Sequence, residues 1–288
     1  MQATGVVTET LDRVALRQTL TEAWHTFSHS LTNSWLPDIP EGDTICFVPS
    51  WSMVELPFSL LLGGAGYLVE RNPIAYLPSL SFLAYWMGSE PQQGIYRPLV
   101  LGDSLGDLPS ARKEAKDVAR RLGTRAILGA DVVRSRITEA LASCDLLHVS
   151  CHAIFDPTSP DRSGFVLADR GIFSARDGIK LRLNAQLAVL SACESGRLQV
   201  KAGDELVGIA SSLLSTGIRS IAATSWRIPD RATTLLVDEF YKNLLDERAG
   251  PAAALRGAQR KLITDDRYSH PYYWAAFRIF GDWRNRFC

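Results

Sequence analysis

The sequence DLLHVSCHAIFDP, residues 145–157, is an apolar run that delivers Cys151 and His152 directly into a proline-containing loop. Forty-one residues after His152, a second apolar run, LAVLSACESG (187–196), ends with Cys193 before a Ser-Gly turn. Short apolar runs bounded by turn residues are typical of buried strands. We therefore expect an imidazole and a thiol at the ends of two strands of one sheet.

Strand-like runs alternate with amphipathic helical patterns along the rest of the chain. Strands are expected at 44–50, 66–71, 97–104, 126–128, 145–151, 187–192 and 217–226. Helices are expected at 8–35, 109–123 (with Ser110 as its N-cap), 131–144, 203–215, 230–248 and 250–264. Such alternation predicts an α/β fold with a parallel sheet covered on both faces, and functional groups of such sheets gather at the carboxyl ends of the strands.

The two strand ends carry the residue types of a cysteine hydrolase. A thiolate attacks carbonyl groups, and a nearby imidazole can accept the thiol proton, which predicts Cys193 as nucleophile and His152 as base. The backbone N–H groups of Cys193 and Ala153 are natural donors to an oxyanion. We expect Glu194 and Ser195, which follow the nucleophile, to contact the substrate. The alternative is a buried structural cysteine beside a histidine that caps a strand.

Two acidic residues lie near the same predicted edge of the sheet. Asp103 ends the strand at 97–104, and Asp204 follows the cysteine loop within AGDE (202–205). Either carboxylate is a candidate to receive a basic substrate side chain. The alternative is that Asp103 caps a turn and Asp204 caps a helix.

The segment LGDSLGD (101–107) contains Gly-x-Ser-x-Gly and the letters GDSL, and DLLH (145–148) supplies an Asp-x-x-His. A nucleophile elbow requires the helix to begin at its serine. Here Pro109 and Ser110 delay the helix after Ser104, and His148 falls inside a strand. A serine hydrolase with Ser104 as nucleophile is therefore the weaker alternative.

Composition excludes several classes of function. Thirty-one basic residues balance 31 acidic ones, so no net field favours nucleic acid or an anionic membrane. The N-terminus lacks the pattern of a signal peptide, and the longest apolar stretch, 56–69, is too short to span a bilayer. We expect a cytoplasmic protein.

The five cysteines, at 46, 144, 151, 193 and 288, show no Cys-x-x-Cys spacing. This pattern argues against a disulfide framework and against a zinc knuckle. His25 and His29 are spaced as two metal ligands on a helix, but no third ligand lies near them in the sequence. We expect neither a metal nor an organic cofactor.

With Cys193 and His152 assigned, the chain resembles the CHAT domain, a caspase-like module usually associated with tetratricopeptide repeats, within the group of caspase, separase and legumain-type cysteine proteases. The resembling segments are 48–61, 67–83, 108–123, 146–153, 187–196, 203–230 and 270–281. The resemblance implies a caspase-like three-layer sandwich, Cys193 and His152 as catalytic dyad, and Asp103 as the residue that grips a basic substrate side chain. The chain departs from the family at Ala153, where the family has glycine after the histidine.

The sequence thus predicts an intracellular cysteine endopeptidase that cuts a partner protein as a regulated signalling or defence effector. We expect residues 41–288 to form the CHAT protease domain and residues 1–40 to form a helix that docks a regulatory protein partner or merely covers the core. The alternative function is a catalytically inactive caspase-like scaffold.

Overall fold

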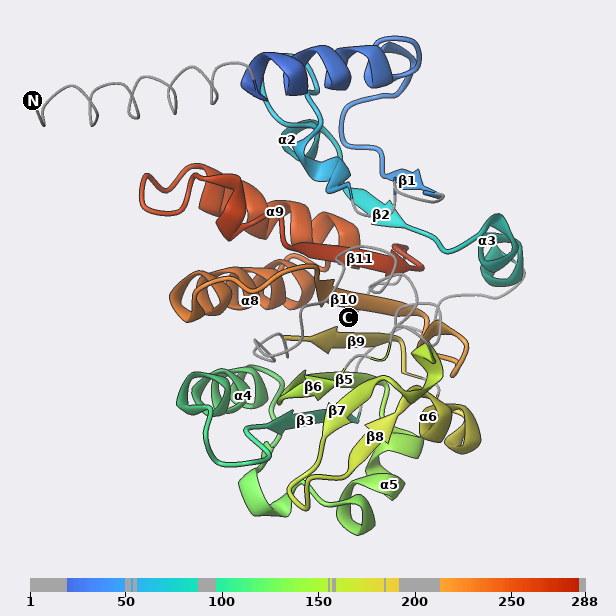
Figure 1. The fold of residues 1–288 in the computed structure, drawn as a ribbon, viewed down its shortest axis with the longest axis vertical. Helices are drawn as coiled ribbons and strands as arrows, with labels where there is room; N and C mark the ends of the chain where they lie inside the picture. The colour runs from blue at the N-terminus through green and yellow to red at the C-terminus, as the bar shows by residue number, and fades with distance from the viewer. Residues whose placement is uncertain are drawn as a thin grey trace, which may run out of the picture.

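An eight-stranded sheet, in the order β1-β2-β11-β10-β9-β5-β3-β4, forms the centre of the computed structural model (Figure 1). The structure describes residues 20–49, 53, 56–87, 97–154, 156, 159–183, 185–191 and 213–284. The strands are β1 (Ile45–Phe47), β2 (Ile74–Tyr76), β3 (Pro98–Gly102), β4 (Ile127–Leu128), β5 (Leu146–Ser150), β9 (Leu187–Leu190), β10 (Ser220–Thr224) and β11 (Phe277–Gly281). Every neighbouring pair is parallel except β10 with β11, which confirms the predicted, mostly parallel sheet.

Helices and a small second sheet cover the two faces of the central sheet (Figure 1). The helices are α2 (Leu68–Arg71), α3 (Leu80–Met87), α4 (Pro109–Arg121), α5 (Arg134–Ser143), α6 (Ala175–Leu181), α8 (Asp230–Leu245) and α9 (Pro251–Ile263). The second sheet is β6 (Ala153–Ile154), β7 (Gly164–Val166) and β8 (Ile172–Ser174). Short 3-10 turns span Leu36–Asp38, Phe58–Leu60, Gly129–Asp131, Pro160–Arg162 and Pro271–Tyr273.

Strand β5 lies near the middle of the sheet, and all five of its residues are buried. Because side chains alternate along a strand, Leu147 and Val149 face an apolar pocket walled by β7, β8 and Leu183. His148 and Ser150 face the opposite way, toward α4 and α8. The face that carries His148 is therefore the polar one at this end of the molecule.

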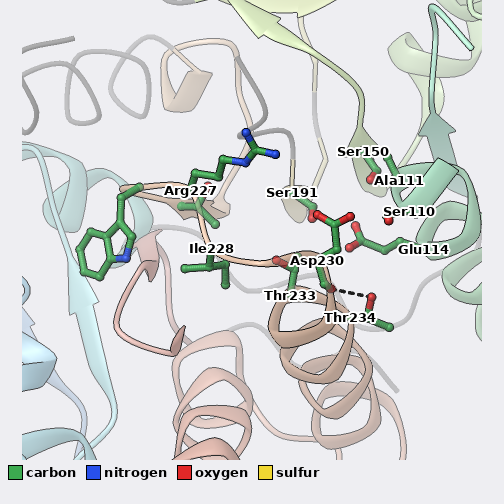
Figure 2. Close-up of a pocket in the computed structure, with 12 residues that line it drawn as sticks. Ser110, Ala111, Glu114, Ser150, Ser191, Arg227, Ile228, Asp230, Thr233 and Thr234 are labelled. Carbon is green, nitrogen blue, oxygen red and sulfur yellow. Dashed lines mark hydrogen bonds between the residues drawn. The ribbon is translucent and has the colours of Figure 1, made fainter. Parts of the chain in front are cut away.

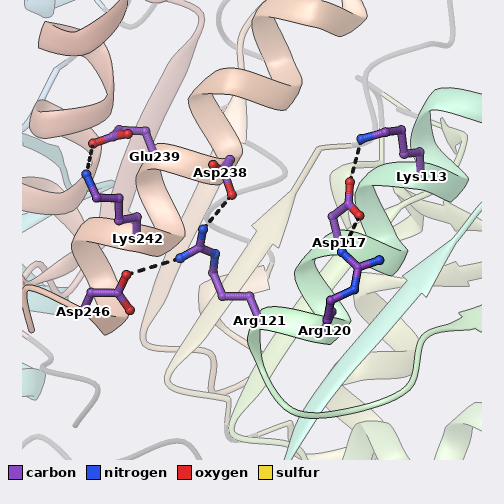
Figure 3. Close-up of polar contacts among 8 residues, drawn as sticks. All are labelled: Lys113, Asp117, Arg120, Arg121, Asp238, Glu239, Lys242 and Asp246. Atoms are coloured by element: carbon purple, nitrogen blue, oxygen red, sulfur yellow. Dashed lines mark hydrogen bonds and ion pairs between the residues drawn. The ribbon is translucent and has the colours of Figure 1, made fainter.

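Helices α4 and α8 are joined across their exposed edges by one arginine (Figure 3). The guanidinium of Arg121, on α4, contacts Asp238 at 2.8 Å and Asp246 at 3.3 Å, the first on α8 and the second just after it. Asp117 contributes further ion pairs within α4 alone. Residues at the start of both helices line one pocket beside the carboxyl ends of the strands.

The helix expected at 8–35 is present as residues 20–32 in the described part of the chain, and residues 8–19 lie outside it. The indole N–H of Trp24 donates to the carbonyl oxygen of Leu60 at 3.1 Å. Trp24, Phe27 and Leu31 pack against the hydrophobic core. This helix therefore covers part of the core, and its use as a docking segment stays a prediction.

Two local predictions are wrong. Residues 68–71 form helix α2 rather than part of a strand, because the Glu70 carboxylate accepts the N–H of Tyr67 at 2.7 Å and stabilises a helical turn. Ser110 is not the N-cap of α4, because Pro109 begins that helix and Leu108 occupies the cap position. Proline is favoured at this first helical position, since its missing N–H needs no partner there.

Candidate active site

His152 lies two residues after β5 and is held by a carboxylate. Its Nε2 atom lies 2.9 Å from Oδ1 of Asp107, and the two side chains are 22% and 58% exposed. A carboxylate only accepts hydrogen bonds, so Nε2 carries the proton of the neutral ring and Nδ1 keeps its lone pair. No described residue bonds to Nδ1. The arrangement leaves Nδ1 available as a base.

Asp107 was not among the site residues expected from the sequence. It belongs to the loop between β3 and α4, in which Asp103 and Gly106 both have positive φ angles. The N–H of Gly106 donates to the carbonyl oxygen of Asp103 at 3.1 Å and closes a turn just before Asp107. Asp107 is the last residue of the GDSLGD segment. This segment resembles a serine-hydrolase motif, so its sequence does not indicate an aspartate that bonds to a histidine.

Cys193 lies outside the described residues, as do Glu194, Ser195 and Asp204, so their expected roles stay predictions. The strand that leads to Cys193 is described as far as Ser191, whose N–H donates to the carbonyl oxygen of Val149 at 3.0 Å. Val149 lies opposite Leu190 in the parallel pairing of β5 and β9. His152 and Cys193 thus follow this last pair by the same number of residues.

Ala153 begins β6 and pairs with Phe165 of β7. It is absent from the non-glycine residues with positive φ, so its backbone is one that alanine adopts without strain. The departure from the family's glycine is therefore compatible with the local backbone. The expected oxyanion role of the Ala153 N–H stays a prediction.

Asp103 is 1% exposed and bonds within its own loop. Its Oδ1 accepts the N–H of Leu108 at 2.8 Å, and its Oδ2 accepts from Nε of Arg112 at 2.6 Å. These contacts match the alternative in which Asp103 caps a turn. A substrate cation could reach this carboxylate only if the pair with Arg112 opened, so the substrate role of Asp103 stays a prediction.

The residues of the serine-hydrolase alternative do not form a catalytic pair. Ser104 is 2% exposed. Both ring nitrogens of His148, a residue that is fully buried in β5, are already bonded, Nδ1 to the Tyr241 hydroxyl at 3.0 Å and Nε2 to Glu114 at 3.2 Å. His148 therefore has no nitrogen with which to activate Ser104.

Cys151, which directly precedes His152 in the sequence, is a poor nucleophile. Cys151 is 1% exposed, and burial raises the pKa of its thiol to about 11. A thiol with so high a pKa carries very little thiolate at neutral pH. Cys151 therefore does not compete with Cys193 for the catalytic role.

No group of three or more His, Cys, Asp or Glu side chains suited to a metal ion occurs among the residues that the structure describes. Within the same ranges, no helix has the length and apolar character needed to cross a bilayer.

The chain is similar to two curated proteins of one name. Tetratricopeptide repeat protein 28 of Mus musculus is 24% identical in an alignment 283 positions long that covers 78% of this chain and 12% of that protein. The human protein of the same name is 22% identical over the same length and is covered to 11%. The chain thus spans about an eighth of the length of these relatives.

Two solved structures share the fold. The Saccharomyces cerevisiae separase–securin complex aligns with a TM-score of 0.57 and 14% identity, covering 82% of this chain and 15% of that one. The Arg-specific cysteine proteinase gingipain R aligns with a TM-score of 0.63 and 11% identity, covering 92% and 68%. The caspase-like arrangement of a mostly parallel sheet between helices is therefore confirmed. The CHAT domain model matches residues 9–282, and the chain belongs to the CHAT domain family.

Proposed function

We propose that the chain is a cysteine endopeptidase with Cys193 as nucleophile and His152 as general base. The Cys193 sulfur attacks the carbonyl carbon of the cleaved bond while Nδ1 of His152 takes the thiol proton. The N–H groups of Cys193 and Ala153 stabilise the oxyanion. His152 then gives its proton to the leaving amine, and water hydrolyses the acyl-enzyme. This chemistry needs no cofactor.

The pairing of His152 with Asp107 is the observation that carries the proposal. The two residues lie 45 positions apart in the chain, so the tertiary fold brings the carboxylate to the ring. Fixing Nε2 as the protonated atom is what general-base catalysis by Nδ1 requires. The register of β5 and β9 adds support, because both expected dyad residues follow neighbouring parallel strands.

The test is cleavage of a proteome-derived peptide library by the wild type, Cys193→Ala, His152→Ala and Cys151→Ala. We expect cuts by the wild type and by Cys151→Ala, and none by the other two variants. Identical cuts by the wild type and Cys193→Ala would overturn the assignment of the nucleophile. The Cys151 variant is the matched control, because it removes a thiol that lies next to His152 in the sequence.

The second candidate function is a caspase-like scaffold without catalysis. It is favoured by the curated relatives, which are named for tetratricopeptide repeats rather than for an activity. An electrophilic peptide probe separates the two readings, since a scaffold would not be labelled at Cys193.

The natural substrate we propose is another protein of the cytoplasm, cut at few sites as a regulated signal. The segment 1–40 is proposed to receive a regulatory protein partner, and the exposed Leu20 side chain lies on its described part. Substrate contacts by Asp103, Glu194, Ser195 and Asp204 belong to the same proposal. No contact with nucleic acid or membrane is part of it.

A further inference from the structure

The loop between β3 and α4 is organised by one buried carboxylate, that of Asp103, which is 1% exposed. Its Oδ1 atom accepts the N–H of Leu108 at 2.8 Å, and its Oδ2 atom accepts from Nε of Arg112 at 2.6 Å. Leu108 directly precedes α4, and Arg112 lies in the first turn of that helix. Asp103 therefore ties the end of β3 to the start of α4 and closes the loop that contains Asp107.

The backbone of Asp103 attaches the same loop to β5. Its N–H donates to the carbonyl oxygen of Ser150 at 2.9 Å and continues the parallel pairing of β3 with β5. Its carbonyl oxygen accepts the N–H of Gly106 at 3.1 Å. Ser150 lies two residues before His152. Gly106 lies directly before Asp107, so Asp103 contacts both segments that carry the hydrogen-bonded pair.

Asp103 also adopts a backbone conformation that few residues adopt. Its φ angle is 48°, in the left-handed region. Aspartate and asparagine enter this region more readily than other residues with a side chain, and glycine enters it freely. The position therefore makes two demands, a positive φ and two acceptor oxygens. Glycine meets only the first demand, asparagine meets the first and half of the second, and aspartate meets both.

The ion pair of Asp103 with Arg112 depends on a glycine in the 3-10 turn after β4. Gly129 has a φ angle of 59°, and a Cβ atom there would lie 2.8 Å from Nη2 of Arg112. A side chain at this position would displace the guanidinium. The Arg112 side chain is 39% exposed and that of Asp103 is 2% exposed. A buried carboxylate needs such a partner, so the cation fixes Asp103 from outside its loop.

Helix α4 begins beside the strand ends that lead to the expected dyad. Its first turn, Ser110 and Ala111, lines a pocket with Ser150 at the end of β5 and with Ser191 just after β9 (Figure 2). Because Asp103 is bonded to this helical turn and to Ser150, a change at Asp103 shifts the loop relative to β5.

We propose that Asp103 is a positioning residue, which holds the loop between β3 and α4 so that Asp107 reaches His152. The inference rests on the proposed protease function and deepens it, because it says what orients the general base. Both oxygens of the Asp103 carboxylate are used in this role. The role needs no contact with the substrate, and the experiment separates it from the expected grip on a substrate side chain.

The cleavage test is a double-mutant cycle on one reporter peptide that the wild type cuts. Asp103→Gly keeps the positive φ and removes both acceptors, and we expect it to lower kcat/KM about tenfold. Asp103→Asn keeps one acceptor and lowers kcat/KM less. Asp103→Gly combined with Asp107→Ala is no slower than Asp107→Ala alone, because the first residue acts through the second. Losses that multiply would overturn the inference and favour direct contact of Asp103 with the substrate.

The control variant is Asp282→Asn. Asp282 is also 1% exposed and also paired with an arginine, Arg219 at 2.9 Å. It follows β11 at the end where Gly281 pairs with Ser220, the first residue of β10, so it lies at the opposite edge of the sheet from His152. At a temperature where circular dichroism shows each variant folded, it leaves kcat/KM unchanged. An equal loss in Asp282→Asn and Asp103→Gly would overturn a specific role for Asp103.

An NMR measurement decides the inference even if the protein cuts no peptide. Correlations from the carbon-bound ring protons to the two ring nitrogens of His152, assigned by their absence from His152→Ala, show which nitrogen is protonated at a pH where the ring is neutral. We expect nearly all of the proton on Nε2 in the wild type and in Asp282→Asn, and a mixture in Asp107→Ala and Asp103→Gly.

The outcomes of this measurement separate the inference from the proposed function. An unchanged ratio in Asp103→Gly would overturn the inference and leave the protease standing. A changed ratio in a chain that cuts nothing supports the positioning role, and the missing cleavage then counts against the protease alone.

Discussion

The imidazole of His152 and the carboxylate of Asp107 form a hydrogen-bonded pair, with 2.9 Å between Nε2 and Oδ1. The two residues come from the loops after β5 and β3, which are adjacent parallel strands. Their carboxyl ends meet at one edge of the sheet, so a loop from each can hold a shared side-chain contact. Asp107 is therefore a positioning residue for His152.

Asp107→Ala should lower kcat/KM about tenfold to a hundredfold, because the ring loses the group that fixes its orientation and its protonated nitrogen. His152→Ala should abolish cleavage. The measurement is cleavage of one reporter peptide between pH 5 and pH 9. A positioning role predicts that the pH profile changes as well as the rate, whereas a purely structural role would lower the rate alone.

Asp131→Ala is the matched control for Asp107→Ala. Asp131 is also 58% exposed and also paired, with Arg136, but it lies in the 3-10 turn before α5. It should leave cleavage and its pH profile unchanged. An equal loss of activity in both variants would contradict a specific role for Asp107.

Ala153→Gly tests whether the family's glycine matters here. Since Ala153 does not have a positive φ, restoring glycine should change kcat/KM by less than about twofold. It should lower the free energy of unfolding by about 0.5–1 kcal/mol, because glycine loses more backbone entropy on folding. Urea unfolding and the reporter peptide measure the two effects. A tenfold gain in activity would show that the oxyanion donor needs glycine.

The strand ends that carry His152 and lead to Cys193 were predictable because both strands are short apolar runs that end in turn residues. Both faces of β5 are buried, and its sequence combines three apolar residues, Leu146, Leu147 and Val149, with His148 and Ser150. In the structure Val149 pairs with Leu190, so the two runs lie side by side as neighbouring parallel strands. Such strands can be predicted because apolar residue types indicate which segments are buried.

The parts that were missed depend on contacts between distant residues. Asp107 contacts His152 only because the loops after β3 and β5 meet at one edge of the sheet, and Glu114 contacts His148 only because α4 packs on β5. The sequence of α2 also fits a strand, because four residues of mixed polarity match either periodicity, and the contact of Glu70 with the Tyr67 N–H favours the helix. A single sequence carries no signal for such tertiary contacts.

The buried carboxylate of Asp282 should make stability depend on pH. It is 1% exposed and contacts Arg219 at 2.9 Å and Arg284 at 2.8 Å. Burial alone raises the pKa of this carboxyl, but hydrogen bonds from Arg284 and Arg219 outweigh burial and lower the pKa below its usual value. The stabilisation is therefore fully present above about pH 4 and is lost as the pH falls through the lowered pKa of the folded state.

Asp282→Asn should lower the free energy of unfolding by about 3 kcal/mol at pH 7, because the buried ion pair between Asp282 and Arg219 is broken. The difference from the wild type should shrink as the pH is lowered toward 3. Urea unfolding across this range measures it. Asp131→Asn, at an exposed pair, should cost less than about 1 kcal/mol at every pH. A constant difference for Asp282→Asn would contradict the linkage.

Tyr241→Phe should lower the free energy of unfolding by about 1–3 kcal/mol, because Nδ1 of His148 is left buried without a donor. Tyr273→Phe is the control, since no described residue bonds to its hydroxyl. An equal loss of stability in Tyr241→Phe and Tyr273→Phe would contradict a specific contribution from the bond between Tyr241 and His148.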